Sequence, residues 1–160
     1  MNHSLHSFEI SIHWNPSPRK KGGYTRDHIL STGNAEIIHG SAAKQFHGNP
    51  DSWNPEQLLI SAVAQCHMLT FLFLANRSKI RIASYTDTAT GSIRMDKDGI
   101  GGEFEVINLY PTITVACKVA ERENILEQLM HLDKDVSKYC FIRRSILTPV
   151  ESKLVVNWSD

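Results

Sequence analysis

Asn54-Pro55-Glu56-Gln57-Leu58-Leu59 leads into the longest uncharged stretch of this chain and decides where its main helix begins. Asn is a preferred N-cap residue, Pro suits the first helical position, and Gln at the third position can complete a capping box. All three signals indicate the same start. We therefore predict a helix from Pro55 to about Asn76 or Arg77, with the rest of the fold arranged around it.

This stretch could be mistaken for a membrane span, because Leu58 to Ala75 is 18 residues long and carries no charge. Four polar residues, however, are spread around it, and charged residues lie close to both ends. The polar four are Ser61, Gln65, His67 and Thr70. We expect a central helix that is buried on most sides of a globular protein.

Outside this helix, most segments alternate apolar and polar residues or are rich in Thr, Ile and Tyr, as is typical of strands. Pro16-Ser17-Pro18 and Gly22-Gly23 predict turns, 40–53 predicts a loop, and 96–102 predicts a hairpin loop. Pro111 is expected at a bulge or a sheet edge. The predicted strands are 8–14, 24–31, 36–39, 80–95, 103–117 and 153–158.

Glu121-Arg122-Glu123 predicts the start of a second helix, because acidic residues in a first turn complement the helix dipole. Apolar residues follow at helical spacing as far as Val136. Strands, a long helix, a hairpin, a second helix and a last strand make an α+β protein. With no repeat or linker in the sequence, we expect one domain over residues 1–160.

The composition narrows the class of protein. Lys+Arg and Asp+Glu both number 17, and this balance argues against a nucleic-acid-binding protein, which usually carries a basic surplus. Three cysteines are an odd number, so they do not form a secreted disulfide framework. The first residues lack the basic and apolar regions of a signal peptide. We expect a cytoplasmic protein, in which thiol pairs are more often redox-active than structural.

Two cysteines are candidates for chemistry. Cys66 falls well inside the predicted helix, and Cys140 falls in the basic segment just after the second helix. A reactive thiolate is favoured by a nearby cation and opposed by apolar burial, so a reactive Cys66 needs a cation from elsewhere, with Arg26 the first candidate. The alternative is a small buried apolar residue. Cys117 lies in mid-strand and is expected to be structural.

The wider pattern resembles the OsmC/Ohr family of thiol-dependent peroxidases. Asn54 to Leu59 followed by Cys66-His67-Met68-Leu69 is similar to the hallmark segment of that family. Tyr24-Thr25-Arg26-Asp27-His28 resembles the arginine-bearing segment of one OsmC-like branch, and the segment 140–145 resembles the second-cysteine segment. The resemblance implies antiparallel sheets around a long central buried helix, in an intertwined homodimer.

The resemblance also implies four site residues. Cys66 would attack a peroxide oxygen, and Cys140 would resolve the resulting sulfenic acid as a disulfide. Arg26 would hold the thiolate, and Glu56 would orient that arginine. The implied reaction is reduction of an organic hydroperoxide to an alcohol, with an external dithiol as reductant and with no cofactor or metal. Neither nucleic acid nor a membrane is expected as a partner.

The spacing of Glu56 and Cys66 has a consequence for assembly. Ten residues span about 15 Å along a helix, so one straight helix cannot bring the two side chains together. Either the helix start bends back, or Glu56 comes from a second copy. We predict a two-fold dimer with antiparallel central helices, in which each site draws on both chains.

Other interpretations stay open at this point. A non-catalytic OsmC-like protein could bind a small apolar molecule, and a redox sensor could use the same disulfide. Cys66 and His67 are adjacent and point about 100° apart on a helix, so they do not chelate one metal ion. His67 is expected to be a hydrogen-bonded helix residue or a neighbour that tunes the site. Asp27 and His28 are either a small polar network or surface residues.

Overall fold

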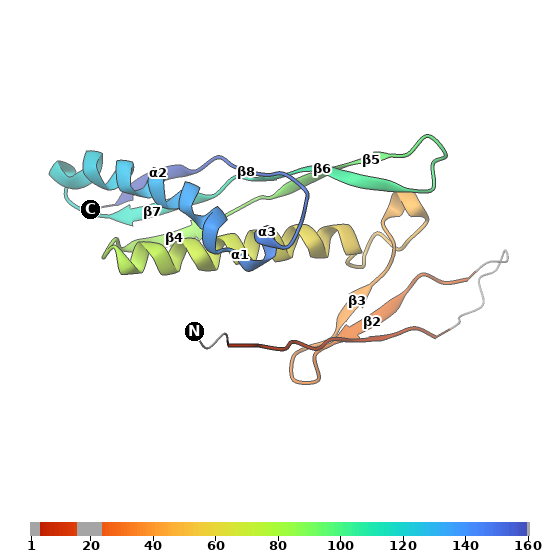
Figure 1. The fold of residues 1–160 in the computed structure, drawn as a ribbon. Helices are drawn as coiled ribbons and strands as arrows, with labels where there is room; N and C mark the ends of the chain where they lie inside the picture. Colours follow the sequence, from red (N-terminus) through yellow and green to blue (C-terminus); the bar gives the residue numbers. More distant parts are fainter. Residues whose placement is uncertain (1–3, 16–23, 160) are drawn as a thin grey trace. The chain divides into compact units, whose positions relative to one another are not determined.

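The computed structural model describes residues 4–15 and 24–159, which form a mixed α+β structure (Figure 1). Contacts divide the chain into two compact units, Met1–Leu58 and Leu59–Asp160. The first helix crosses this boundary, and each unit has its own sheets. The turns predicted at 16–18 and 22–23 lie outside the described residues.

The first unit contains one small antiparallel sheet in the order β1-β2-β3. Its strands are Ser11–His13, His28–Ser31 and Ile38–Gly40, each shorter than predicted. The expected loop 40–53 contains one short 3-10 helix, Lys44–Phe46. The prediction of a half-buried strand at 8–14 is wrong for this chain, because all of β1 is exposed and the apolar Phe8 is 95% exposed. No second layer in the described part of the unit covers this strand.

The main helix, α1, runs from Pro55 to Arg77, which confirms both predicted ends. Its start is a reciprocal cap. The backbone N–H of Gln57 donates to Asn54 Oδ1 at 2.8 Å, and the backbone N–H of Asn54 donates to Gln57 Oε1 at 3.3 Å. Two backbone donors that the helix leaves without partners are thereby satisfied, so the local sequence alone fixes this end.

Burial of α1 differs from the prediction. Only one stripe of the helix is buried in this chain, at the four-residue spacing of a single helix face: Val63, His67, Phe71 and Ala75. By length and composition α1 could cross a membrane, yet only 28% of its most apolar window is buried here. The expectation of burial on most sides is therefore wrong for a single chain. Leu69 and Phe73, for example, are 61% and 58% exposed.

The second unit contains two three-stranded sheets, ordered β4-β7-β9 and β5-β6-β8. Both are mixed rather than antiparallel as expected, because β9 runs parallel to β7 and β8 runs parallel to β6. Each long predicted strand is divided in two, and one of the breaks falls at the buried Pro111, which lacks an N–H for the ladder. The short strand β8 was not predicted. The bounds are Ile82–Thr86, Thr90–Met95, Gly102–Leu109, Thr112–Ala116, Val150–Ser152 and Val155–Ser159 for β4 to β9.

The second predicted helix is observed as α2, Arg122–Tyr139, after a 3-10 turn at Val119–Glu121. A short helix, α3, follows directly at Phe141–Arg144. The larger core cluster joins α1, α2 and β7, which lie together in Figure 1. Its buried members are Phe71, Ala75, Ile80, Ile113, Val115, Leu129, Val136 and Cys140. A second cluster consists of Val63, Ile107, Leu109 and Val150.

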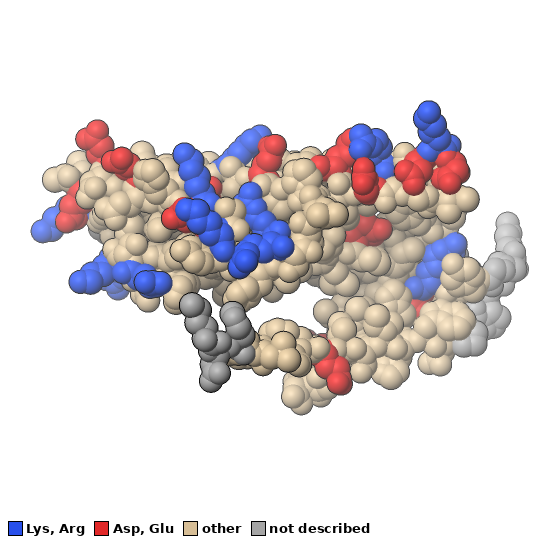
Figure 2. Space-filling model, in the orientation of Figure 1, with Lys and Arg blue, Asp and Glu red and all other residues tan. Residues whose placement is uncertain are grey.

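Charged side chains of both signs are intermingled on the surface, in keeping with the net charge of zero. Figure 2 shows Lys and Arg intermingled with Asp and Glu over the visible face of the second unit. One surface pair joins Arg94 and Glu103 across the β5–β6 hairpin at 3.1 Å, and both side chains are mostly exposed. Such exposed pairs contribute little to stability.

Removing the α1 cap should destabilise the fold. We expect Asn54→Ala to lower the free energy of unfolding by about 1 kcal/mol, because the Gln57 N–H loses its acceptor. Urea denaturation at one fixed protein concentration measures this difference. Asn54→Asp is the matched control and should stay close to wild type, since Asp caps equally well. Equal stability of all three proteins would contradict the role of the cap.

Candidate functional site

The fold brings the two candidate thiols together. Cys66 lies on α1, Cys140 lies between α2 and α3, and the Cys140 thiol hydrogen-bonds to the Cys66 sulfur. Cys140 is a buried member of the larger core cluster, and Cys66 packs against that cluster. They differ in access, because Cys66 is partly exposed whereas Cys140 has no exposed surface. An oxidant that approaches this pair from solvent therefore reaches Cys66 first.

Local backbone geometry places the Cys140 sulfur. The residue leaves the helical conformation at φ −70° and ψ 109°, which ends α2 and starts α3. Its sulfur accepts a hydrogen bond from the backbone N–H of Arg143 at 3.4 Å, so Cys140 is the N-cap of α3. The Arg143 guanidinium donates to the Val150 carbonyl at 2.6 Å and ties α3 to β8. The basic segment after α2 is therefore a capped helical turn.

The surroundings of Cys140 affect its acidity. Burial, and then the hydrogen bond to Cys66, raise the pKa of the Cys140 thiol from 9.0 to about 11. Burial disfavours the charged form, and a proton shared with a neighbouring sulfur is harder to remove. Cys140 is therefore a thiol near neutral pH, and it can donate its S–H to Cys66.

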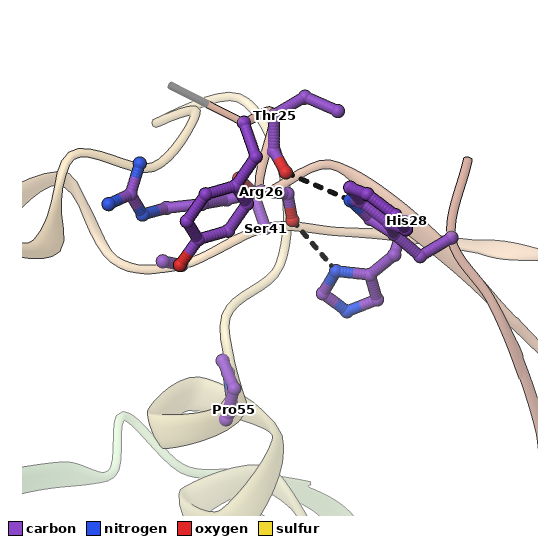
Figure 3. A pocket seen from close by; sticks show the side chains of 8 residues that line it. Thr25, Arg26, His28, Ser41 and Pro55 are labelled. Atoms are coloured by element: carbon purple, nitrogen blue, oxygen red, sulfur yellow. Dashed lines mark hydrogen bonds between the residues drawn. The ribbon is translucent and has the colours of Figure 1, made fainter. Parts of the chain in front are cut away.

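Arg26 lies in the first unit and lines a pocket of about 480 Å³ (Figure 3). Its guanidinium lies 4.9 Å from the centre of the Tyr24 ring, in a cation–π contact. His28 Nδ1 donates to the Arg26 carbonyl at 2.9 Å, which fixes the backbone beside the pocket. The other lining residues are Trp14, Thr25, Ser41, Ala42 and Pro55.

Asp27 is part of a small polar network, one of the two interpretations left open by the sequence. Ser41 is buried, and its hydroxyl donates to Asp27 Oδ1 at 2.8 Å. The same hydroxyl oxygen accepts the backbone N–H of Asn49 at 3.0 Å. This network joins the loop after β3 to the segment that carries Arg26.

Glu56 lies in the first turn of α1, and its Oε2 is buried with no hydrogen-bond partner among the described residues. Because α1 is continuous, its start does not bend back, and Glu56 stays about 15 Å from Cys66 along the axis. Arg26 and Glu56 belong to the first unit, whereas both thiols belong to the second. The structure thus defines the thiol pair but does not join it to Arg26 or Glu56.

The sequence analysis expected a hydrogen-bonded His67 but missed its partners, Tyr85 and Asp133. His67 is 1% exposed and lies close to Asp133 on α2 and Tyr85 on β4. The available signal was Asp133, a carboxylate between Leu129 and Val136 on the buried face of its helix. Charged residues are rarely buried without a partner, so this position indicated a buried polar contact.

The family follows from comparison with known proteins. A family described as OsmC-like protein matches residues 48–155, more than half of the chain. This chain belongs to the OsmC-like family. No curated protein matches it. The match includes Glu56, Cys66 and Cys140 but not Arg26, which lies before residue 48.

Solved structures show the same OsmC/Ohr fold. An OsmC-like protein of unknown function from Vibrio cholerae matches at a TM-score of 0.79 and 23% identity, covering 94% of this chain and 100% of that one. An organic hydroperoxide resistance protein from Legionella pneumophila matches at 0.66 and 20%, covering 97% and 99%. Another from Elizabethkingia anophelis matches at 0.65 and 20%, covering 98% and 99%. The TM-scores establish the fold, and the predicted α+β class is confirmed.

The two thiols should differ in reactivity toward an alkylating reagent. We expect iodoacetamide at pH 8 to label Cys66 at least about tenfold faster than Cys140, because Cys140 is buried and its pKa is raised. Peptide mass spectrometry over time measures both rates in one sample. In denaturant the two rates should become similar. Equal rates in the folded protein would contradict the burial of Cys140.

Proposed function

We propose that this OsmC-like protein is a thiol-dependent peroxidase that reduces organic hydroperoxides to alcohols through Cys66 and Cys140. The observation that carries the proposal is the contact between an accessible thiol and a buried one that is distant in sequence. Two similar structures are of organic hydroperoxide resistance proteins, which supports the substrate class.

The first step oxidises Cys66. Its thiolate attacks one oxygen of the hydroperoxide, an S–O bond forms, and the O–O bond breaks. The departing alkoxide takes a proton and leaves as the alcohol, while Cys66 becomes a sulfenic acid. The Cys140 S–H is well placed to stabilise charge on Cys66, because it hydrogen-bonds to that sulfur.

The second step closes a disulfide. The Cys140 sulfur loses its proton and attacks Cys66, forming the S–S bond and releasing the sulfenic oxygen as water. An external dithiol then exchanges with the disulfide and returns both cysteines to thiols. Contact between the sulfurs before oxidation means that the second step needs little chain movement.

Arg26 and Glu56 enter the proposal through a homodimer. The exposed apolar residues of α1 favour a second helix as cover, and Glu56 has a buried carboxylate oxygen that no described residue pairs. In a two-fold dimer with antiparallel α1 helices, the Glu56 end of one helix lies toward the Cys66 region of the other. Arg26 would then pair with Glu56 and supply the cation beside Cys66.

The cysteine variants test this cycle. Cys66→Ser should abolish reduction of cumene hydroperoxide, because no sulfenic acid can form. Cys140→Ser should consume about one equivalent of hydroperoxide per chain and then stop when only a dithiol specific for disulfides is present. Alcohol formation followed by chromatography measures both. Cys117→Ser is the matched control and should turn over like wild type.

Two results would oppose the proposal. Turnover by Cys66→Ser at the wild-type rate would exclude Cys66 as the attacking residue. Stable oxidation of the wild type without repeated turnover, whatever dithiol is offered, would instead indicate a redox sensor.

Closure of the disulfide should speed up with pH. Burial raises the pKa of the Cys140 thiol, also when Cys66 is a sulfenic acid, so the attacking thiolate becomes more abundant throughout the range from pH 7 to 10. We expect the rate of disulfide closure to rise about tenfold per pH unit over that range. Rapid mixing followed by acid quench measures it. A rate that levels off near pH 8.5 would indicate an ordinary thiol.

A further inference from the structure

A buried polar network joins the two helices that carry the thiols. His67 Nε2 on α1 lies 3.2 Å from Asp133 Oδ1 on α2, with the two side chains 1% and 10% exposed. His67 Nδ1 lies 3.1 Å from the Tyr85 hydroxyl on β4. The Ser152 hydroxyl on β8 donates to the same Asp133 oxygen at 2.9 Å. One histidine and one carboxylate thus connect four elements of the second unit.

The partners define the tautomer of the neutral His67 ring. Burial, and then the carboxylates of Asp87 and Asp133, raise the pKa of the Tyr85 hydroxyl, which therefore keeps its proton. A carboxylate only accepts, so Nε2 carries the ring proton and Nδ1 accepts from Tyr85. The Nε2–Asp133 contact is close but not aligned as a hydrogen bond, so its attraction is mainly electrostatic.

Such a network contributes little net free energy to the stability of a core. Buried polar groups lose their hydration, and the hydrogen bonds that they form return only a modest net stability. Among the described residues, no cluster of three or more His, Cys, Asp or Glu side chains could hold a metal ion. Its place between the helices suggests a different role, because polar contacts inside a helix interface can select one register.

The positions of the four residues point to the thiol pair. His67 directly follows Cys66 on α1, and Asp133 precedes Cys140 by seven residues, which is two turns of α2. The His67–Asp133 contact and the Cys66–Cys140 contact are therefore two points of one helix–helix interface. Two separate contacts fix both the rotation of each helix and its sliding along the other. Apolar packing alone tolerates small shifts of either kind.

We propose that the His67–Asp133 pair is a register contact, which holds α1 and α2 at the offset where Cys66 and Cys140 can bond. His67 and Asp133 are then positioning residues for the disulfide. The inference rests on the proposed function in that the disulfide is the intermediate of the peroxidase cycle. The simpler alternative is a core histidine that affects stability alone.

The experiment measures the thiol pair without peroxide. The protein is equilibrated with mixtures of reduced and oxidised glutathione, and the fraction carrying the Cys66–Cys140 bond is measured by mass spectrometry. In this exchange one glutathione disulfide accepts two electrons from the two cysteine thiols, and two glutathione thiols are released. The equilibrium constant is the effective concentration of one thiol toward the other.

The double variant His67→Leu/Asp133→Leu removes the register contact and replaces it with apolar side chains of similar size. We expect this variant to stay folded with a modest loss of thermal stability, because the Tyr85 and Ser152 hydroxyls lose their partners. The effective concentration of the thiol pair should nevertheless fall about tenfold, which is a reduction potential about 30 mV less negative. Val63→Ala is the matched control, because Val63 lies on α1 in the other core cluster. It should lower stability and leave the effective concentration unchanged.

An unchanged effective concentration in the folded double variant would overturn the inference. If the double variant does not fold, Asp133→Asn carries the same test, because it keeps an acceptor for Ser152 and removes only the charge beside His67. A fall in its effective concentration supports the register contact, and no change overturns it. A wild-type protein that forms the bridge with glutathione but does not reduce hydroperoxides would refute the proposed function and leave this inference intact.

Discussion

The contact between α1 and the C-terminal end of α2 is the constraint on which the rest of the structure depends. It places Phe71 and Ala75 of α1 in the larger core cluster and brings Cys140 against Cys66. The strand β7 supports the same cluster from the sheet. Everything proposed about the chemistry requires this one interface, because Cys66 and Cys140 meet there.

The interface also separates the roles of two chemically identical side chains. Burial, and then the hydrogen bond to Cys66, raise the pKa of Cys140 and keep it a protonated thiol, whereas Cys66 keeps some access to solvent. This difference arises from local structure, since Cys140 ends one helix and caps the next while Cys66 lies within a continuous helix. In the proposed cycle, this difference in access suits Cys66 to attack the peroxide and Cys140 to resolve the sulfenic acid.

Local signals in the sequence predicted α1 well, because Asn54, Pro55 and Gln57 act on neighbouring backbone groups. Positions that depend on tertiary packing were predicted less well. The long strands were not expected to divide, and β8 was missed because its three residues have little pattern of their own and pair only with β6. Burial of α1 and of the strand at 8–14 was overestimated. An apolar pattern indicates that a surface is suited to burial, but it does not indicate what packs against that surface. The contact of Cys66 with Cys140 agrees with the resemblance to the family, while the roles of Arg26 and Glu56 stay predictions.

The central claim is that folding holds two thiols, which are distant in sequence, close enough to form a disulfide. The most direct measurement is peptide mapping of the wild-type protein after one equivalent of cumene hydroperoxide, without reductant and with the thiols blocked at quench. The account predicts one new cross-linked pair, Cys66 with Cys140 within one chain, and an unmodified Cys117. Sulfenic or sulfinic acid on Cys66 with Cys140 still free, or a bridge that involves Cys117, would contradict it.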